Sequence, residues 1–419
     1  MLEWLKLVSN PTDRCSPNQC FSERSTASRT IAPIGKSTRR AVPPDKAVDT
    51  WLGFKIGSEL GRRDGFPQCS TIVDLPGPLG SIERARQLER SASVHLRWPC
   101  KALGRRVMLE EFGTRHIKTA GTEIFLRHAG HGPAVLLLHG YPQTHVEWRH
   151  VAPALAKQYT VVCPDLRGYG ASGHAHADPT HTAYSKRAMG NDLVEVMESL
   201  GFARFAVVGH DRGGRVAYRL ALDYQARVAA LCVLDIVPTS EAWNRTNMAR
   251  ALGGFHWGLL AQPEPLPEKL IGSDPDFFME WILRAWAAPG FVFDSEALTA
   301  YREAFRDRNV IHATCEDYRA GATIDYAHDL EDQKHGRKIL CPVLALWGER
   351  DAAGKPTDFL QIWRQWADDV IGAGIKCGHF LAEEAPEELL GHLKPFLERT
   401  LAQKASTPTG NMSPPRLRG

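Results

Sequence analysis

The stretch with the clearest potential for chemistry is Gly209-His210-Asp211-Arg212-Gly213. It has the form G-x-D-x-G, in which an aspartate takes the place that serine has in the nucleophile elbow G-x-S-x-G. The glycines allow close backbone approach and the strained turn that lifts the central side chain above a sheet. Because an ordinary Asp titrates near ~3.9, a carboxylate there is ionised at neutral pH and needs no base to activate it. The pattern predicts that Asp211 is a nucleophile rather than a helix cap.

Two arginines follow the aspartate at a spacing that suits an anionic substrate. Arg212 and Arg215 are three residues apart at the start of an expected helix, so both side chains can lean to one side. A small carboxylate held by both guanidinium groups would gain charge-assisted hydrogen bonds of roughly 1.5–3 kcal/mol each. This grip would place the adjacent carbon over Asp211. The alternative is that the pair forms structural salt bridges.

A general base and its orienting acid are also present. His379 lies in the turn Cys377-Gly378-His379-Phe380, after an expected short strand near 370–375. An imidazole with an ordinary pKa near ~6.5 suits proton transfer at neutral pH. It needs a carboxylate to orient it, and the sequence offers two. Asp235 closes the apolar run 229–234, and Asp351 follows the run 342–347.

The elements that position these residues alternate along the chain. Apolar runs at 134–138, 160–163, 205–208, 228–234 and 342–347 are separated by helical stretches. This alternation predicts an α/β fold with a mostly parallel, doubly wound sheet and a site at the carboxyl ends of its strands. We assign 106–237 and 338–401 to this core, and the aromatic-rich stretch 238–337 to a helical cap that excludes water. A single helix is expected over 143–158, and another over 214–224.

The two ends of the chain differ from the core. Residues 1–105 are rich in Ser, Arg, Pro and Gly and lack sustained periodicity. We interpret them as a disordered extension, with a mis-assigned start upstream of Met108 as the alternative, and assign them no chemistry. The Pro-, Ser- and Thr-rich segment 402–419 is interpreted as a disordered tail.

Composition excludes several classes of function. The net charge of +3 over 419 residues, without a basic stripe, argues against nucleic-acid binding. No apolar run reaches the ~18 residues of a membrane span. Nine scattered cysteines without a C-x-x-C pair favour a reducing compartment, so we expect a cytoplasmic protein. No cluster with metal-ligand spacing occurs, so we expect no metal and no cofactor. The expected partner is a small-molecule substrate, and a homodimer is left open.

From about 112 to 401, the chain resembles the α/β-hydrolase superfamily and, within it, the fluoroacetate (haloacetate) dehalogenases. The resemblance rests on the elbow and on three further motifs, which are His139-Gly140-Tyr141-Pro142, Asp165-Leu166-Arg167-Gly168-Tyr169-Gly170 and Cys377-Gly378-His379-Phe380. The aspartate elbow narrows the superfamily to dehalogenases and epoxide hydrolases, and the two arginines narrow it further. The resemblance implies an α/β-hydrolase fold with a helical cap inserted after the sixth strand.

The resemblance also implies roles for individual residues. Dehalogenases carry their acid at the place of Asp235, whereas epoxide hydrolases carry it at the place of Asp351. We favour Asp235 because its context Asp235-Ile236-Val237-Pro238 also matches. The backbone N–H groups of Tyr141 and Arg212 are expected to form the oxyanion hole. The halide donors implied by the family are His256, Trp257 and Tyr318.

The function expected from these residues is hydrolytic dehalogenation of small 2-haloacids such as fluoroacetate or chloroacetate. Asp211 would form an ester and His379 would activate the water that hydrolyses it. An epoxide hydrolase with the same nucleophile is the alternative. A third hypothesis, a receptor or scaffold without turnover, is disfavoured by the complete set of Asp, His and orienting acid.

Overall fold

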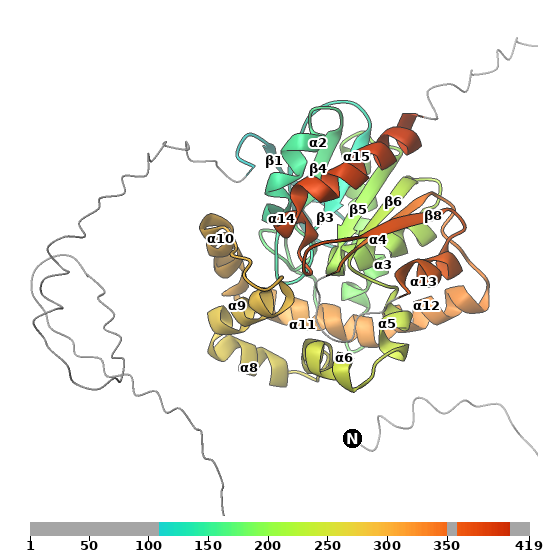
Figure 1. Ribbon diagram of the computed structural model, residues 1–419. Coiled ribbons are helices and arrows are strands. Elements are labelled where there is room, and N and C mark those ends of the chain that lie inside the picture. The colour runs from blue at the N-terminus through green and yellow to red at the C-terminus, as the bar shows by residue number, and fades with distance from the viewer. Residues whose placement is uncertain (1–108, 350–357, 403–419) are drawn as a thin grey trace, which may run out of the picture. The chain divides into compact units, whose positions relative to one another are not determined.

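A single eight-stranded sheet forms the centre of the structure (Figure 1). The computed structural model describes residues 109–349 and 358–402. The strand order is β1-β2-β4-β3-β5-β6-β7-β8, with β1, β2 and β4 paired antiparallel and the remaining neighbours parallel. The strands are β1 (Gly113–Lys118), β2 (Glu123–Ala129), β3 (Ala134–Leu138), β4 (Thr160–Pro164), β5 (Phe205–His210), β6 (Val228–Leu234), β7 (Val343–Gly348) and β8 (Val370–Ile375).

Helices cover both faces of this sheet, which explains why the central strands are apolar throughout. In β3, Leu136 and Leu138 pack into one hydrophobic cluster, while Val135 and Leu137 pack into another. The first cluster includes side chains of α3 (Lys186–Ser199), α4 (Asp211–Asp223) and α13 (Phe359–Trp366). The second includes side chains of η2 (His145–His150), α2 (Ala152–Leu155) and α15 (Pro386–Ala402). The sheet is therefore doubly wound, and the predicted fold class is confirmed.

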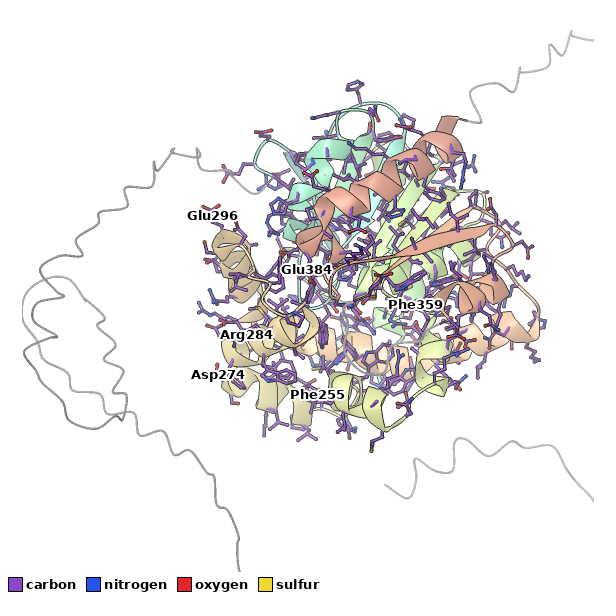
Figure 2. The ribbon with its side chains drawn as sticks, in the orientation of Figure 1. Phe255, Asp274, Arg284, Glu296, Phe359 and Glu384 are labelled. Carbon is purple, nitrogen blue, oxygen red and sulfur yellow. The ribbon has the colours of Figure 1, made fainter. Side chains whose placement is uncertain are left out.

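A run of helices is inserted between β6 and β7 and lies at one end of the sheet (Figure 1). Phe255 from this helical insertion and Phe359 from α13 both line the cavity described below (Figure 2). The helices are α5 (Thr239–Asn244), α6 (Met248–Gly253), α7 (Phe255–Leu260), α8 (Leu266–Ser273), α9 (Pro275–Trp286), α10 (Ser295–Phe305), α11 (Arg308–Ala322) and α12 (Ile324–Lys334).

Two helix predictions need correction. The helix expected over 143–158 is two short segments, η2 and α2. Pro153 lies in the first turn of α2, where its missing N–H and its ring disfavour a helix that would continue from η2. The helix after the elbow begins at Asp211, earlier than 214. The assignments of 1–105 and of the tail, and the alternative acid Asp351, lie outside the described residues.

Within the described ranges, none of the helices is both long enough and apolar enough to cross a bilayer. The same residues contain no group of three or more His, Cys, Asp or Glu side chains arranged to hold a metal ion.

Candidate active site

Asp211 occupies a strained turn between β5 and α4. Its φ of +44° lies in the left-handed region that L-residues rarely adopt. Glycine is required at 209 and 213, because this turn leaves no room for a side chain at either position. A Cβ at Gly209 would lie 2.5 Å from the carbonyl oxygen of Gly213, and one at Gly213 would lie 2.4 Å from that of Leu138. The elbow geometry expected from G-x-D-x-G is therefore present, and the strain holds the carboxylate at the end of the sheet.

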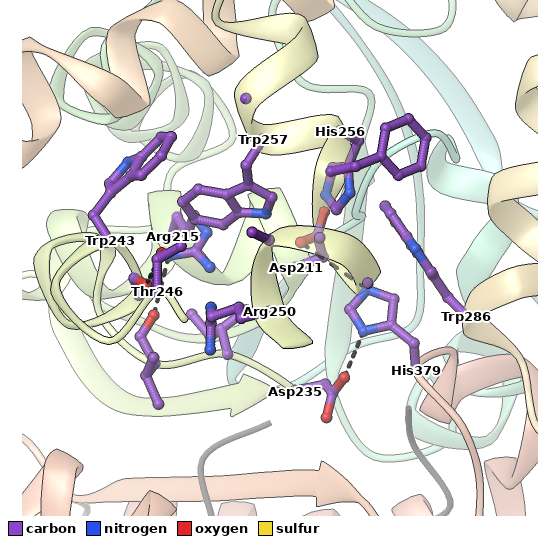
Figure 3. Close-up of a pocket in the computed structure, with 18 of the residues that line it drawn as sticks. Asp211, Arg215, Asp235, Trp243, Thr246, Arg250, His256, Trp257, Trp286 and His379 are labelled. Carbon is purple, nitrogen blue, oxygen red and sulfur yellow. Dashed lines mark hydrogen bonds and ion pairs between the residues drawn. The ribbon is translucent and has the colours of Figure 1, made fainter. Parts of the chain in front are cut away.

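His379 lies between two carboxylates (Figure 3). Its Nδ1 is 2.5 Å from Oδ2 of Asp235, and its Nε2 is 4.0 Å from Oδ2 of Asp211. The other Asp235 oxygen accepts the backbone N–H of Gly348 at 3.1 Å. Asp235 also has a positive φ of +58°. This arrangement fixes the ring with Nε2 directed toward Asp211, as a base acting on an Asp211 adduct requires.

A backbone donor lies beside the nucleophile. The N–H of Tyr141 donates to Oδ1 of Asp211 at 3.0 Å. Gly140 brings this loop close, since a Cβ at that position would lie 2.8 Å from Cβ of Asp211. Tyr141 is thus placed as an oxyanion donor, whereas the contribution of the Arg212 N–H stays a prediction.

The two arginines differ in their surroundings. Nε and Nη2 of Arg212 donate to the carboxylate of Asp317 at 2.8 and 3.0 Å, while its buried Nη1 has no hydrogen-bond partner among the described residues. Arg215 lines the cavity, and its Nη1 donates to the carbonyl oxygen of Val237 at 3.0 Å and to Thr239 at 3.4 Å. The Arg215 Nε has no partner in that part of the chain. The alternative to substrate binding was that the two arginines form structural salt bridges. This interpretation holds in part for Arg212 and does not hold for Arg215.

Three aromatic rings of the helical insertion meet above the nucleophile. The ring centroids of His256 and Tyr318 are 5.6 Å apart, and those of Trp257 and Tyr318 are 6.0 Å apart. Tyr318 also lies over Arg212, whose Cζ is 4.0 Å from the ring centroid, and Trp257 lies over Arg215 at 4.4 Å. The structure thus brings together the three predicted halide donors and the two predicted carboxylate binders.

Burial keeps these rings uncharged. Burial lowers the pKa of His256 to about 3, and the charge of Asp211 offsets this only in part. Burial, together with the charge of Asp211, also raises the pKa of Tyr318 well above its ordinary value. The hydroxyl of Tyr318 and Nδ1 of His256 are buried without hydrogen-bond partners among the described residues. They are neutral groups that a ligand can engage.

The nucleophile remains ionised despite being buried. Burial alone would raise the pKa of the Asp211 carboxyl, but nearby positive charges outweigh it and hold the pKa below its usual value. These charges come from His379, Arg212, His210 and Arg215.

A cavity of about 260 Å³ is lined by part of this set, but Tyr141, Arg212 and Tyr318 are not among its lining residues. Asp211, His379, Arg215 and His256 line it together with apolar side chains of the helical insertion (Figure 3). Trp286 forms part of the wall, with its ring centroid 5.2 Å from that of His379 and 4.4 Å from that of His256. The volume of this cavity is large compared with that of a two-carbon acid.

Several residues that shape the site carry no signal in the sequence. Asp317 accepts hydrogen bonds from Arg212 and so orients its guanidinium group. Lys186, which belongs to α3, pairs with Asp317. Glu147 pairs with His210. Glu384 accepts the N–H groups on both sides of His379, those of Gly378 and Phe380, at 2.8 and 2.9 Å. Only the position of Asp317, directly before Tyr318, could have drawn attention to it.

The fold and the site define an α/β hydrolase with an aspartate, Asp211, at the nucleophile elbow. A family model for the alpha/beta hydrolase fold matches residues 133–386, and the chain belongs to this family.

The relatives of the chain include a dehalogenase and an epoxide hydrolase. A fluoroacetate dehalogenase of Burkholderia sp is 43% identical over 291 residues, which are 69% of this chain and 95% of that protein. A soluble epoxide hydrolase of Corynebacterium sp. (strain C12) is 33% identical over 264 residues, or 62% of this chain and 88% of that protein. A solved structure from Nostoc sp PCC 7120, named as an alpha/beta hydrolase, is 50% identical with a TM-score of 0.67 and covers 69% of this chain and 99% of its own. The chain is thus a hydrolase related to dehalogenases.

Proposed function

We propose that the chain hydrolyses the carbon–halogen bond of small 2-haloacids through an ester on Asp211. The observation that carries this proposal is the set of unpaired, buried donors around an ionised carboxylate. Nη1 of Arg212 and Nε of Arg215 face no acceptor among the described residues, and both guanidinium groups stack on the rings of the halide donors. Buried donors of this kind are costly unless a ligand satisfies them. A carboxylate with an adjacent halogen supplies the missing acceptors.

In the first step, an oxygen of Asp211 displaces the halide. We assign the attack to Oδ2, because Oδ1 accepts the N–H of Tyr141. The Oδ2–carbon bond forms as the carbon–halogen bond breaks, and the halide leaves with the bonding electrons. His256, Trp257 and Tyr318 donate hydrogen bonds to the departing ion. Fluoride needs such donors most, because it is the most strongly hydrated halide.

In the second step, water hydrolyses the ester. His379 takes a proton from the water at Nε2, and the hydroxide oxygen adds to the carbonyl carbon of Asp211. Asp235, at 2.5 Å from Nδ1, stabilises the imidazolium that forms. The Tyr141 N–H stabilises the negative charge on Oδ1. Collapse of this adduct breaks the ester bond, and the leaving alkoxide oxygen takes the proton from His379 to give the 2-hydroxyacid. The Asp211 carboxyl then loses its proton to solvent, so one proton is released overall.

The test compares Asp211→Asn with the parent protein for release of chloride and fluoride from chloroacetate and fluoroacetate. We expect no release from the variant. His379→Asn should release up to one equivalent of halide and then stop, with the ester on Asp211 detectable by mass spectrometry. Halide release that survives Asp211→Asn would overturn the mechanism.

An epoxide hydrolase is the second candidate, and a specific observation favours it. The hydroxyls of Tyr141 and Tyr318 are buried without hydrogen-bond partners in the described ranges, and their ring centroids are 5.4 Å apart. Two such phenols could activate an epoxide oxygen. Styrene oxide, assayed for diol beside chloroacetate assayed for chloride, separates the two candidates. The 43% identical dehalogenase and the two arginines support the first.

A further inference from the structure

A buried histidine and glutamate lie directly behind the nucleophile. The side chains of His210 and Glu147 are 0% and 1% exposed. Nδ1 of His210 lies 3.0 Å from Oε1 of Glu147, and its Nε2 lies 2.8 Å from the backbone carbonyl oxygen of His379. Neither residue lines the cavity, and the two-step reaction described above does not use them.

The geometry gives this histidine a charge. A neutral imidazole has one N–H, yet here one nitrogen faces a carboxylate and the other faces a carbonyl oxygen, and both of these are acceptors. We interpret the pair as an imidazolium and a carboxylate in ion-pair contact, although the angle between Nδ1 and Oε1 does not make a hydrogen bond. Burial alone would lower the pKa of His210, but the charge of Glu147 outweighs burial and raises it to about 9. The other ionisable groups facing His210 are Asp211, Asp235 and His379.

The ion pair joins three segments of the site. Oε2 of Glu147 accepts the N–H of Gly140 at 2.9 Å, and the next residue, Tyr141, donates to Asp211. His210 itself belongs to the elbow and holds the carbonyl oxygen of His379. The packing is close, because a Cβ at Gly140 would lie 2.9 Å from Nδ1 of His210. The oxyanion loop, the nucleophile and the base are thus linked through one buried pair.

We propose that Glu147 and His210 are positioning residues that hold His379 in place for hydrolysis of the Asp211 ester, an inference that rests on the proposed two-step reaction. His210 supplies a charged donor to the carbonyl oxygen of His379, while the N–H of His379 donates to the carbonyl oxygen of Trp286 at 2.9 Å. Without His210, the carbonyl oxygen of His379 keeps the longer hydrogen bond from the N–H of Leu381, at 3.2 Å, and loses the shorter, charged one.

This role affects the two steps unequally. Displacement of halide needs the carboxylate of Asp211 and the donors of the helical insertion; the hydrogen bonds of the pair go instead to Gly140 and His379, and the charge of His210 acts on Asp211 through space. Hydrolysis of the ester needs Nε2 of His379 within reach of a water at the ester carbon. Misplacement of a catalytic group by about 1 Å can cost on the order of 100-fold in rate. Loss of the pair should therefore slow the second step and leave the first nearly intact.

The experiment uses the double variant Glu147→Gln/His210→Phe in the full chain. The glutamine retains an acceptor for the N–H of Gly140, and the phenylalanine retains volume without a donor. Removing both charges together avoids an unpaired buried ion, and replacement of a buried pair in this way often leaves stability unchanged. The matched control, Arg167→Met/Asp192→Asn, removes a buried pair with a 2.7 Å contact on the other side of the elbow helix. A thermal melt checks that both variants fold.

With chloroacetate, we expect the double variant to release about one equivalent of chloride at a rate within about threefold of the parent. Steady-state release should then be about 10- to 100-fold slower, with the ester accumulating on Asp211. The control should change neither phase by more than about threefold. Equal slowing of both phases, or unchanged steady-state release in a folded double variant, would overturn the proposal. A parent protein that releases halide from neither chloroacetate nor fluoroacetate would instead overturn the proposed function.

A second measurement does not depend on any substrate. Nitrogen-15 shifts of labelled histidine should show His210 with both ring nitrogens protonated near pH ~8, well above the ordinary titration near ~6.5. Glu147→Gln should convert it to a neutral ring at that pH. A neutral His210 in the parent protein would contradict the proposal even if the kinetics agreed.

Discussion

The clearest prediction concerns Asp317, which directs Arg212 toward the site without touching the cavity. Its two carboxylate oxygens accept Nε and Nη2 of Arg212 at 2.8 and 3.0 Å. The same carboxylate pairs with Lys186 and accepts the hydroxyl of Tyr169 at 2.8 Å. Burial alone would raise the pKa of Asp317, but Arg212 and Lys186 outweigh burial and hold it far below its usual value. Asp317→Asn keeps the shape but offers Arg212 one side-chain acceptor in place of two, while the backbone carbonyl oxygen of Asp317 still accepts Nη2 at 2.8 Å.

The magnitude follows from Nη1, the one nitrogen of Arg212 without a partner among the described residues. With Nε and Nη2 occupied, Nη1 can give one charge-assisted hydrogen bond to a carboxylate, worth roughly 1.5–3 kcal/mol. If the guanidinium turns when Asp317 is neutralised, this bond is lost and KM for chloroacetate rises about 10- to 150-fold. The charge alone has the opposite sign, because removing a carboxylate makes the site more attractive to anions. The direction of the change in KM therefore decides between geometry and charge.

The assay measures kcat and KM for chloride release from chloroacetate and from its neutral analogue chloroacetamide. We expect kcat/KM for chloroacetate to fall and that for chloroacetamide to stay within about threefold. Asp325→Asn is the control, because Asp325 pairs with Lys186 at 3.1 Å in the same cluster but does not touch Arg212. A lower KM for chloroacetate, or an equal loss with both substrates, would refute the reasoning.

Three further predictions rest on single contacts. Trp257→Phe removes an indole donor, so release of fluoride should fall at least about tenfold and release of bromide about twofold, compared on fluoroacetate and bromoacetate. Arg215→Gln should reduce kcat/KM for chloroacetate more than Arg212→Gln does, by about tenfold, because Arg215 has only neutral hydrogen-bond partners in the described chain and its charge is free for substrate; equal losses would contradict this. Burial would raise the pKa of Asp165, but His145, in contact at 2.9 Å, outweighs it and lowers the pKa to about 2. Its stabilisation is present above the unfolded value near ~4 and is lost as pH falls toward 2, so Asp165→Asn should lower the free energy of unfolding by about 2 kcal/mol at pH 7 but little near pH 2, as measured in urea.

The sequence was sufficient for residues that the backbone itself places. The elbow fixes Asp211 because glycines at 209 and 213 are required by contacts of 2.5 and 2.4 Å. Asp235 follows β6, which neighbours β5, and His379 follows β8, two strands further along the sheet. Because these strands are parallel, their carboxyl ends bring both residues to the same edge of the sheet as Asp211. The fold class was predictable for the same reason, since β3 to β7 are continuous apolar runs and both faces of the sheet are covered.

Residues that act through other residues could not be found in this way. Asp317 meets Arg212 across 105 residues of chain, and Glu147 meets His210 only because η2 packs beside the elbow. Neither pair has a fixed spacing, and each carboxylate alone would be interpreted as an ordinary helical residue. The expected single helix over 143–158 also concealed Glu147, since the short η2 segment, capped by Thr144, is what turns this side chain inward.

The charges around Asp211 explain why the site needs these hidden carboxylates. Arg212, His210 and His379 each face a carboxylate of their own, which are Asp317, Glu147 and Asp235 respectively. Each of these side chains is therefore held in a fixed place, and the charges of Arg212 and His210 are already partly neutralised before substrate binds. Arg215 differs, because its hydrogen-bond partners are neutral, and the charges that face it through space are those of Arg212 and Asp211, which oppose each other. An arriving carboxylate thus meets one cation whose charge is available, next to a nucleophile whose repulsion that cation already offsets. The three side chains that are paired with a carboxylate set the geometry of the site, and Arg215 supplies the affinity for an anion.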